Sequence, residues 1–145
     1  MNSLRRHTLQ LALLAMVASS TPALATGNPV QVVYHIADGN DQALHALTNV
    51  RNHLVAEPST KIVVVALGAG IDFLLEGAKD RHGQAFDAKV AALSSQGVQF
   101  RVCKNTLMGR KIDPSKVLLE AKVVSSGVAE IARLQAREGF VYIRP

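Results

Sequence analysis

Residues 62–67 read IVVVAL, a nearly continuous apolar run that is rich in β-branched side chains. A strand of this composition is covered on both faces, which is typical of a parallel sheet with helices on either side. Residues 30–36 (VQVVYHI) form a second run of this kind. Between Asp41, suited to start a helix, and Pro58, placed after its end, apolar residues recur at helical spacing: Leu44, Leu47, Val50 and Leu54. The segment is therefore predicted to be a βαβ unit.

The alternation of strands and helices continues to the end of the chain. A helix is predicted around residues 86–93, terminated by Gly97, and residues 98–102 (VQFRV) have the alternation of a strand. A short strand at 122–124, a helix around 128–134 and a strand at 140–143 complete the pattern. Five strands separated by helical segments predict an α/β fold: one three-layer domain with a five-stranded, mainly parallel sheet.

Residues 1–25 have the layout of a cleavable signal peptide. Arg5 and Arg6 precede an apolar stretch at 9–18, and Ala23-Leu24-Ala25 matches the small-x-small pattern of a cleavage site after Ala25. The stretch is shorter than the roughly 20 residues that span a bilayer, so no stable membrane anchor is expected. The sequence predicts export to the periplasm, by general secretion ahead of the twin-arginine route that Arg5-Arg6 weakly resembles.

The remaining residues, 26–145, are close to the commonest size of a single domain. Removal of Arg5 and Arg6 lowers the formal charge from +5 to +3. The basic residues are dispersed and only 4% of residues are aromatic, so nucleic acid is not an expected partner. The sequence has no P-loop and no G-x-S-x-G motif, which argues against the familiar nucleotide-binding and hydrolase sites.

Ligands of open parallel sheets bind outside the carboxyl ends of the strands. Four predicted loops meet there: His35 with residues 38–41, the turn Gly68-Ala69-Gly70, residues 103–106, and Ser125-Ser126-Gly127. The Gly68–Gly70 turn would let backbone amides approach an anion, but a simple tight turn is the preferred explanation. Turn formation and helix capping explain Asp38 and Asp41, so no metal or cofactor is expected.

Cys103, the single cysteine, is the strongest candidate for chemistry. Its cationic neighbours are Arg101, Lys104, Arg110 and Lys111. Asn105 or Thr106 is suited to cap a short helix that begins near the sulfur. Positive charge and a helix start both favour the thiolate, the nucleophilic form. His35 is a candidate proton donor, although a hydrogen-bonded histidine at the rim is the preferred interpretation. The alternatives are that Cys103 is inert packing at a strand end or forms an intermolecular disulfide.

Several segments resemble one known family. Residues 97–100 (GVQF) and 103–107 (CKNTL) are joined by 124–131 (VSSGVAEI), Gln135 and 138–145 (EGFVYIRP), and by 49–54 (NVRNHL) and 63–70. Together they resemble the small stand-alone DsrE/DsrF-like proteins of the sulfur-relay superfamily, over essentially the whole chain after residue 25. The resemblance implies a flavodoxin-like fold and a homo-oligomer, either a trimer or a hexamer.

In sulfur-relay members of that superfamily, a cysteine in the comparable loop holds sulfur as a persulfide and passes it to a partner. By position, this role falls on Cys103. The leading hypothesis is therefore a periplasmic, sulfurtransferase-like sulfur carrier that works with a donor or acceptor protein. Arg101, Lys104 and the amides of Asn105 and Thr106 would stabilise the sulfur anion. The alternative is a non-catalytic oligomeric module that binds a small anion at the same rim, with Cys103 structural.

Overall fold

The computed structural model describes residues 27–145, so the predicted signal peptide lies outside the described residues. Eleven elements follow one another: β1 (Gln31–Ile36), α1 (Asn40–Ala56), β2 (Lys61–Ala66), the 3-10 helix η1 (Gly68–Leu74), α2 (Phe86–Ser94), β3 (Gln99–Cys103), α3 (Lys104–Gly109), the 3-10 helix η2 (Pro114–Lys116), β4 (Ala121–Val124), α4 (Gly127–Glu138) and β5 (Val141–Ile143). No helix among these residues is long and apolar enough to cross a membrane.

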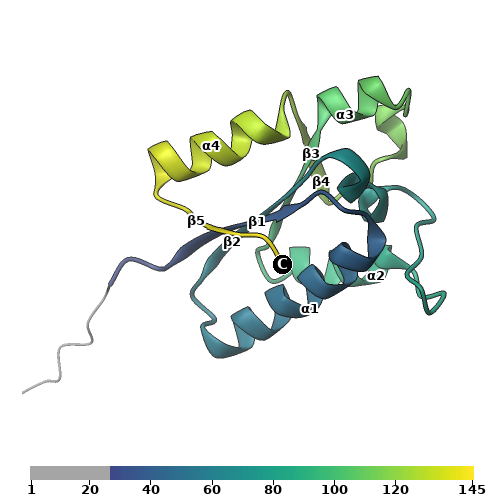
Figure 1. The fold of residues 1–145 in the computed structure, drawn as a ribbon. Helices are drawn as coiled ribbons and strands as arrows, with labels where there is room; N and C mark the ends of the chain where they lie inside the picture. Colours follow the sequence, from purple (N-terminus) through teal and green to yellow (C-terminus); the bar gives the residue numbers. More distant parts are fainter. Residues whose placement is uncertain (1–26) are drawn as a thin grey trace, which may run out of the picture.

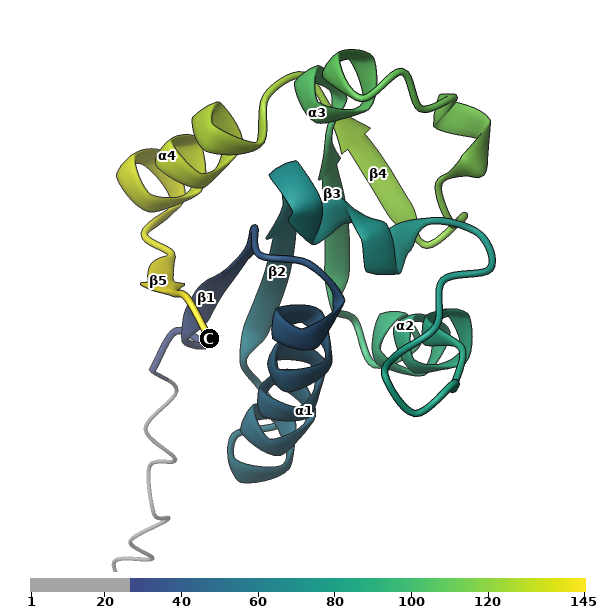
Figure 2. The same ribbon diagram turned by 45° about the vertical axis from the view of Figure 1, so that its right-hand side comes forward.

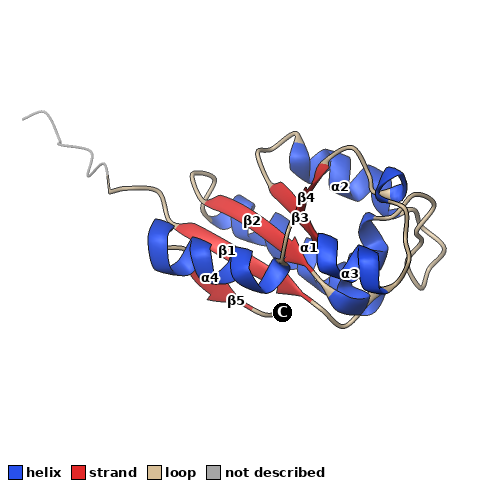
Figure 3. Ribbon diagram, turned by 90° about the horizontal axis from the view of Figure 1, so that it is seen from above, coloured by secondary structure: helices blue, strands red, loops and turns tan. Residues whose placement is uncertain are grey.

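The five strands form a single sheet in the order β4-β3-β2-β1-β5, and every pairing is parallel. Figure 3 shows the strands pointing in one direction. This confirms the predicted α/β architecture, and the sheet is entirely parallel rather than mainly so. Each predicted strand overlaps an observed one, with boundaries that differ by one residue.

Helices cover both faces of the sheet, with α1 and α2 on one side and α4 on the other (Figure 1). The larger core packs Val32, Ile62 and Phe100 of the strands against α1 and α2. The smaller core joins alternate strand residues such as Val33 and Val65 to α4. The period-two alternation of strand side chains thus divides the apolar residues between two layers, which explains why the central strands read as unbroken apolar runs.

The direction of each connection between strands determines where a ligand site can form at the carboxyl edge of the sheet. Strands β1 to β4 follow one another across the sheet, whereas the chain returns from β4 to β5 beyond β1. Because crossovers between parallel strands are right-handed, α4 lies on the opposite face from α1 and α2. Leu107 of α3 belongs to the core of α1 and α2. The connections that leave β3 and β4 therefore diverge to opposite faces, and this divergence is where α/β folds commonly bind ligands.

Candidate functional site

Cys103 lies at this divergence point. It is the last residue of β3, pairs in register with Val124 of β4, and is the N-cap residue of α3. Asn105 and Thr106, expected as possible caps, instead occupy the first turn of α3. Cys103 is 5% exposed, so its side chain is buried. Figure 2 shows the ends of β3 and β4, with α3 and the start of α4 nearby.

The starts of α3 and α4 both lie beside Cys103. Burial raises the pKa of the thiol, but hydrogen bonds from the amides of Gly127, Thr106 and Asn105 and from the Thr106 hydroxyl outweigh it, so the net pKa is lowered. We call these four groups the donor cluster. Two of its amides belong to the start of α3 and one to the start of α4, where the first N–H groups of a helix have no partner within the helix.

Gly127 allows α4 to approach the sulfur closely. A Cβ atom at this position would lie 2.9 Å from Leu67 Cδ2 and 3.2 Å from the Cβ atoms of both Leu67 and Cys103. Ser126 caps α4 by accepting a hydrogen bond from the amide of Ala129. The absence of a side chain at Gly127 therefore brings its amide to the thiol, while the cap fixes where the helix begins.

The glycines of the turn after β2 have different roles. The amide of Gly68, whose φ is +57°, donates to the Thr106 hydroxyl over 3.0 Å and so supports the donor cluster. Gly70 packs against β1: a Cβ there would lie 2.2 Å from the carbonyl oxygen of Ile36. Gly68 is thus connected to α3 through Thr106, whereas Gly70 is a packing residue.

The cations predicted to stabilise the thiolate are placed differently. Arg101 points to the α4 side of the sheet, where its guanidinium forms an ion pair with Glu130. Lys104 and Asn105 have exposed side chains. The hydrogen bonds that lower the pKa of Cys103 come from the donor cluster, and charged side chains are not among the causes. Polar backbone groups, rather than neighbouring cations, thus favour the thiolate.

His35 is separated from Cys103 by β2. Its register partner in β2 is Val65, which in turn pairs with Arg101 of β3. Two strand spacings amount to about 10 Å, too far for direct proton transfer. His35 Nδ1 instead lies 2.8 Å from the hydroxyl of Tyr142 on β5.

Burial and the neighbouring Arg144 lower the pKa of His35, while Asp38 opposes them. Asp38 itself receives two hydrogen bonds from Arg144, at 2.9 and 2.7 Å. The structure therefore places His35 in a separate polar cluster at the β1–β5 side of the sheet, and it does not bring His35 together with the cysteine.

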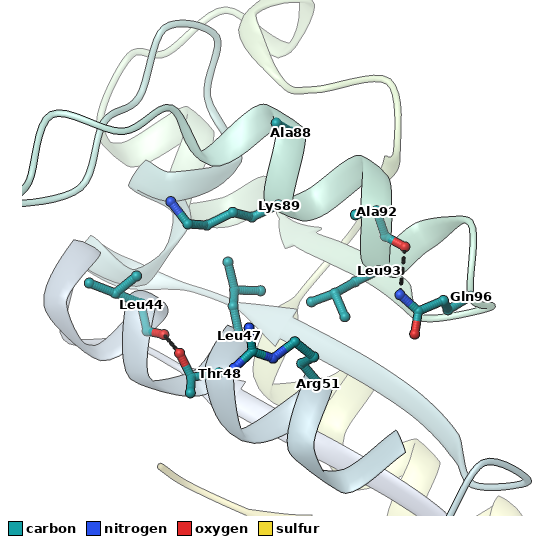
Figure 4. Close-up of a pocket in the computed structure, with 9 residues that line it drawn as sticks. All are labelled: Leu44, Leu47, Thr48, Arg51, Ala88, Lys89, Ala92, Leu93 and Gln96. Atoms are coloured by element: carbon teal, nitrogen blue, oxygen red, sulfur yellow. Dashed lines mark hydrogen bonds between the residues drawn. The ribbon is translucent and has the colours of Figure 1, made fainter. Parts of the chain in front are cut away.

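A groove between two helices lies away from this site. A depression of about 340 Å³ separates α1 from α2, with Leu47 and Leu93 on its apolar floor (Figure 4). Lys89 at one end already binds Asp80 over 2.9 Å. None of the residues predicted for the sulfur site lines this groove.

Sequence reasoning placed Gly127 at the rim but did not identify it as a site residue. Part of the evidence for Gly127 was present in the sequence, because residues 103–106 and Gly127 follow two consecutive predicted strands. What the sequence did not contain was the pairing of β4 with β3, which makes the two loops neighbours.

Comparisons with known proteins identify the family to which the chain is similar. Residues 5–145 match the DsrE/DsrF-like family. A protein of unknown function, MTH1491 from Methanobacterium thermoautotrophicum, is 38% identical, with a TM-score of 0.71 over 80% of this chain and 99% of the other. The ychN protein from E. coli has the same fold, with a TM-score of 0.64 at 16% identity over 81% of this chain and 98% of the other. No curated protein matches the sequence.

Proposed function

Because the chain belongs to the DsrE/DsrF-like family, which suggests a role related to sulfur relay, we propose that it carries sulfane sulfur as a persulfide on Cys103. The observation that supports this proposal is the donor cluster. Polar groups of Gly127, Thr106 and Asn105 lower the pKa of the Cys103 thiol against the opposing effect of burial. A thiolate is the nucleophilic form of cysteine, so this environment prepares Cys103 for attack on sulfur.

The loading step transfers one sulfur atom. With thiosulfate as donor, the Cys103 thiolate attacks the outer sulfane sulfur, a new S–S bond forms, and the bond to the sulfite sulfur breaks. Sulfite leaves with the electron pair of that bond, and the cysteine becomes a persulfide anion. In unloading, an acceptor thiolate attacks the outer sulfur, takes it as its own persulfide, and returns Cys103 as the thiolate. Both steps conserve charge and need no external oxidant or reductant.

The donor cluster serves the anion at each stage. The amides of Gly127, Thr106 and Asn105 are fixed by the helices that they start, so they need no rearrangement when the sulfur becomes charged. Lys104, exposed beside them, provides positive charge at the mouth of the site for an incoming anionic donor.

An intact-mass measurement tests the proposal. After incubation of the purified protein with thiosulfate or polysulfide, the mass should increase by one sulfur atom, and a reducing thiol should remove the increase. Cys103→Ser should give no adduct. An unchanged mass for the wild-type protein, or an adduct that persists in Cys103→Ser, would contradict persulfide formation on Cys103.

A second candidate is favoured by the 5% exposure of Cys103, which suits a packing residue. In that case the protein is a non-catalytic oligomeric module that binds a small anion at the same rim. Cys103→Ala should then keep the assembly and the affinity for sulfite or thiosulfate, measured by calorimetry. Persulfide formation instead predicts that this variant loses all sulfur uptake.

Export and assembly complete the proposal. We place the mature protein in the periplasm on the basis of residues 1–25, and the N-terminal sequence of the protein from a periplasmic extract should begin at Thr26. We also propose a homo-oligomer, a trimer or hexamer, supported by exposed apolar side chains such as Met108 and Val128, which are 65% and 67% exposed. Light scattering after size exclusion should give a mass above that of one chain.

A further inference from the structure

The side chain of Cys103 projects from the face of the sheet that α4 covers. Phe100 and Val102 of β3 belong to the core of α1 and α2, so the alternation of strand side chains puts Cys103 and Arg101 on the opposite face. A Cβ at Gly127 of α4 would lie 3.2 Å from the Cβ atom of Cys103, which agrees with this direction. Any compound that reacts with the sulfur must therefore reach it on the α4 face.

Cys103 has different neighbours on its two sides. Toward β2 lies Leu67, whose Cβ atom is also 3.2 Å from the Cβ position at Gly127 and which packs against the core under α4. Toward β4 lies Val124, the half-buried register partner of Cys103. Helix α4 packs on β1, β2 and β3, whereas β4 is the edge strand farthest from the end of α4 (Figure 2). The β4 side is therefore the more open approach to the sulfur.

A groove of about 360 Å³ lies on that side, between β4 and the first turns of α4. Val124 and Ser126 line the end of the groove nearest the sulfur, because Val124 pairs with Cys103 and Ser126 precedes Gly127. We call it the β4–α4 groove. Its volume is at the lower end of the range for sites that bind small molecules.

The charged residues of the groove leave it with an excess of positive charge. They are Lys122, Glu130 and Arg133. Glu130 already accepts hydrogen bonds from Arg101 and Arg133, which neutralise its carboxylate. Lys122 is exposed, and the described part of the chain gives it no ion-pair partner. It lies two residues before Val124 in β4, hence on the same face and about 7 Å along the strand. Its ammonium group is thus available to an anion in the groove.

We propose that the β4–α4 groove is the binding site through which a small anionic sulfur compound reaches Cys103, and that Lys122 determines the preference for negative charge. The compound belongs to the class of thiosulfate or a thiol that carries a carboxylate. Its anionic group lies beside Lys122 and its reactive end beside Val124. The inference rests on the proposed function for the chemistry at the sulfur, and it adds the charge of the substrate and its route.

Two alkylating reagents of similar size test the route without any sulfur donor. Iodoacetate is an anion and iodoacetamide is neutral, and the Cys103 thiolate displaces iodide from both. Because Cys103 is the single cysteine, both reagents use the same thiolate, and the ratio of their rates cancels any change in its pKa. In the whole protein at low ionic strength, Lys122→Gln should lower the ratio of the iodoacetate rate to the iodoacetamide rate about threefold, and Lys122→Glu about tenfold. High salt should reduce both changes.

Further variants separate the groove from a general effect of charge. Lys61→Gln removes the same charge from an exposed residue at the opposite end of the sheet and should leave the ratio unchanged. Val124→Phe should narrow the groove and slow both reagents, whereas Val124→Ala should accelerate both. A ratio that Lys122→Gln lowers no more than Lys61→Gln, or a larger effect of Lys104→Gln, would overturn the inference. So would rates that neither Val124 variant changes, or a native protein whose Cys103 resists both reagents. Absence of a sulfur adduct after incubation with thiosulfate, with the charge preference intact, would instead reject the proposed function alone.

Discussion

Substitution of Gly127 by alanine tests how closely α4 must approach the sulfur. The added Cβ would lie 3.2 Å from the Cβ atoms of Cys103 and Leu67 and 2.9 Å from Leu67 Cδ2. Ordinary carbon contacts begin near 3.5 Å, so the overlaps to be relieved are about 0.3 to 0.6 Å. Leu67 can rotate its end away, but the two Cβ atoms are fixed by the backbone. The start of α4 should therefore move outward by about 0.3 Å.

This displacement has two measurable consequences. Overpacking of this kind costs about 1–3 kcal/mol, partly offset by the better helix propensity of alanine, so a net loss of about 1–2 kcal/mol is expected. For a domain of this size the melting temperature should fall by roughly 4–10 °C. Weakening the Gly127 amide bond by about 0.7 kcal/mol, half of a bond to a charged group, should raise the thiol pKa by about half a unit and slow alkylation about threefold.

Thermal unfolding and the pH dependence of alkylation measure the two effects separately. Gly109→Ala is the matched control, because Gly109 ends α3 and a Cβ there meets no atom within 4 Å. The control should keep the pKa of Cys103 unchanged. A Gly127→Ala protein with wild-type pKa and melting temperature would refute the idea that a close approach of α4 supports the thiolate.

Three further substitutions or titrations test other parts of the structure. Asp80 accepts hydrogen bonds from Lys89 and two amides, which lower the pKa of its carboxyl to about 2. The stabilisation that these bonds provide is complete above the unfolded pKa near 4 and is lost as pH falls toward 2. Asp80→Asn should therefore flatten the acid unfolding curve in that range. Gly70→Ala should prevent stable folding, seen as loss of a cooperative melting transition, because its Cβ would lie 2.2 Å from the Ile36 carbonyl oxygen; a cooperative transition near the wild-type temperature would contradict this. The lowered pKa of His35 means that the folded state binds the imidazole proton less well than the unfolded state. The contribution of neutral His35 to folding stability is therefore present above about pH 6.5 and decreases as pH falls through the folded-state pKa. NMR titration of the ring should show a midpoint below about 6.5, and a midpoint at or above this value would contradict burial.

The sequence was sufficient to predict the five strands and the helices α1, α2 and α4, because their signals are local, whereas the 3-10 helices η1 and η2 were not predicted. The runs at 30–36 and 62–67 are apolar on both faces, and each overlaps an observed inner strand. The position of Cys103 at the end of a strand followed from the same pattern. The short helix after it was expected near Asn105 or Thr106, but its N-cap is Cys103 itself.

The surroundings of the cysteine were harder to predict, because they depend on strand order. His35 and Cys103 both follow parallel strands, yet β2 separates them. Arg101 is two residues from Cys103, but its charge is paired with Glu130 on α4, 29 residues later in the chain. Periodicity determines which residues face a layer, whereas contacts between layers depend on the order and crossing of elements.

Two opposing effects decide the ionisation of Cys103. Burial alone raises the pKa of a thiol, since the thiolate loses its water, and a cysteine that only filled space would experience this effect without compensation. Here the donor cluster reverses the sign and lowers the pKa. Its amides come from the starts of α3 and α4, where backbone N–H groups would otherwise lack partners. Divergence of the connections after β3 and β4 therefore places a buried sulfur beside the amides that begin two helices, an arrangement that supports the proposed thiolate.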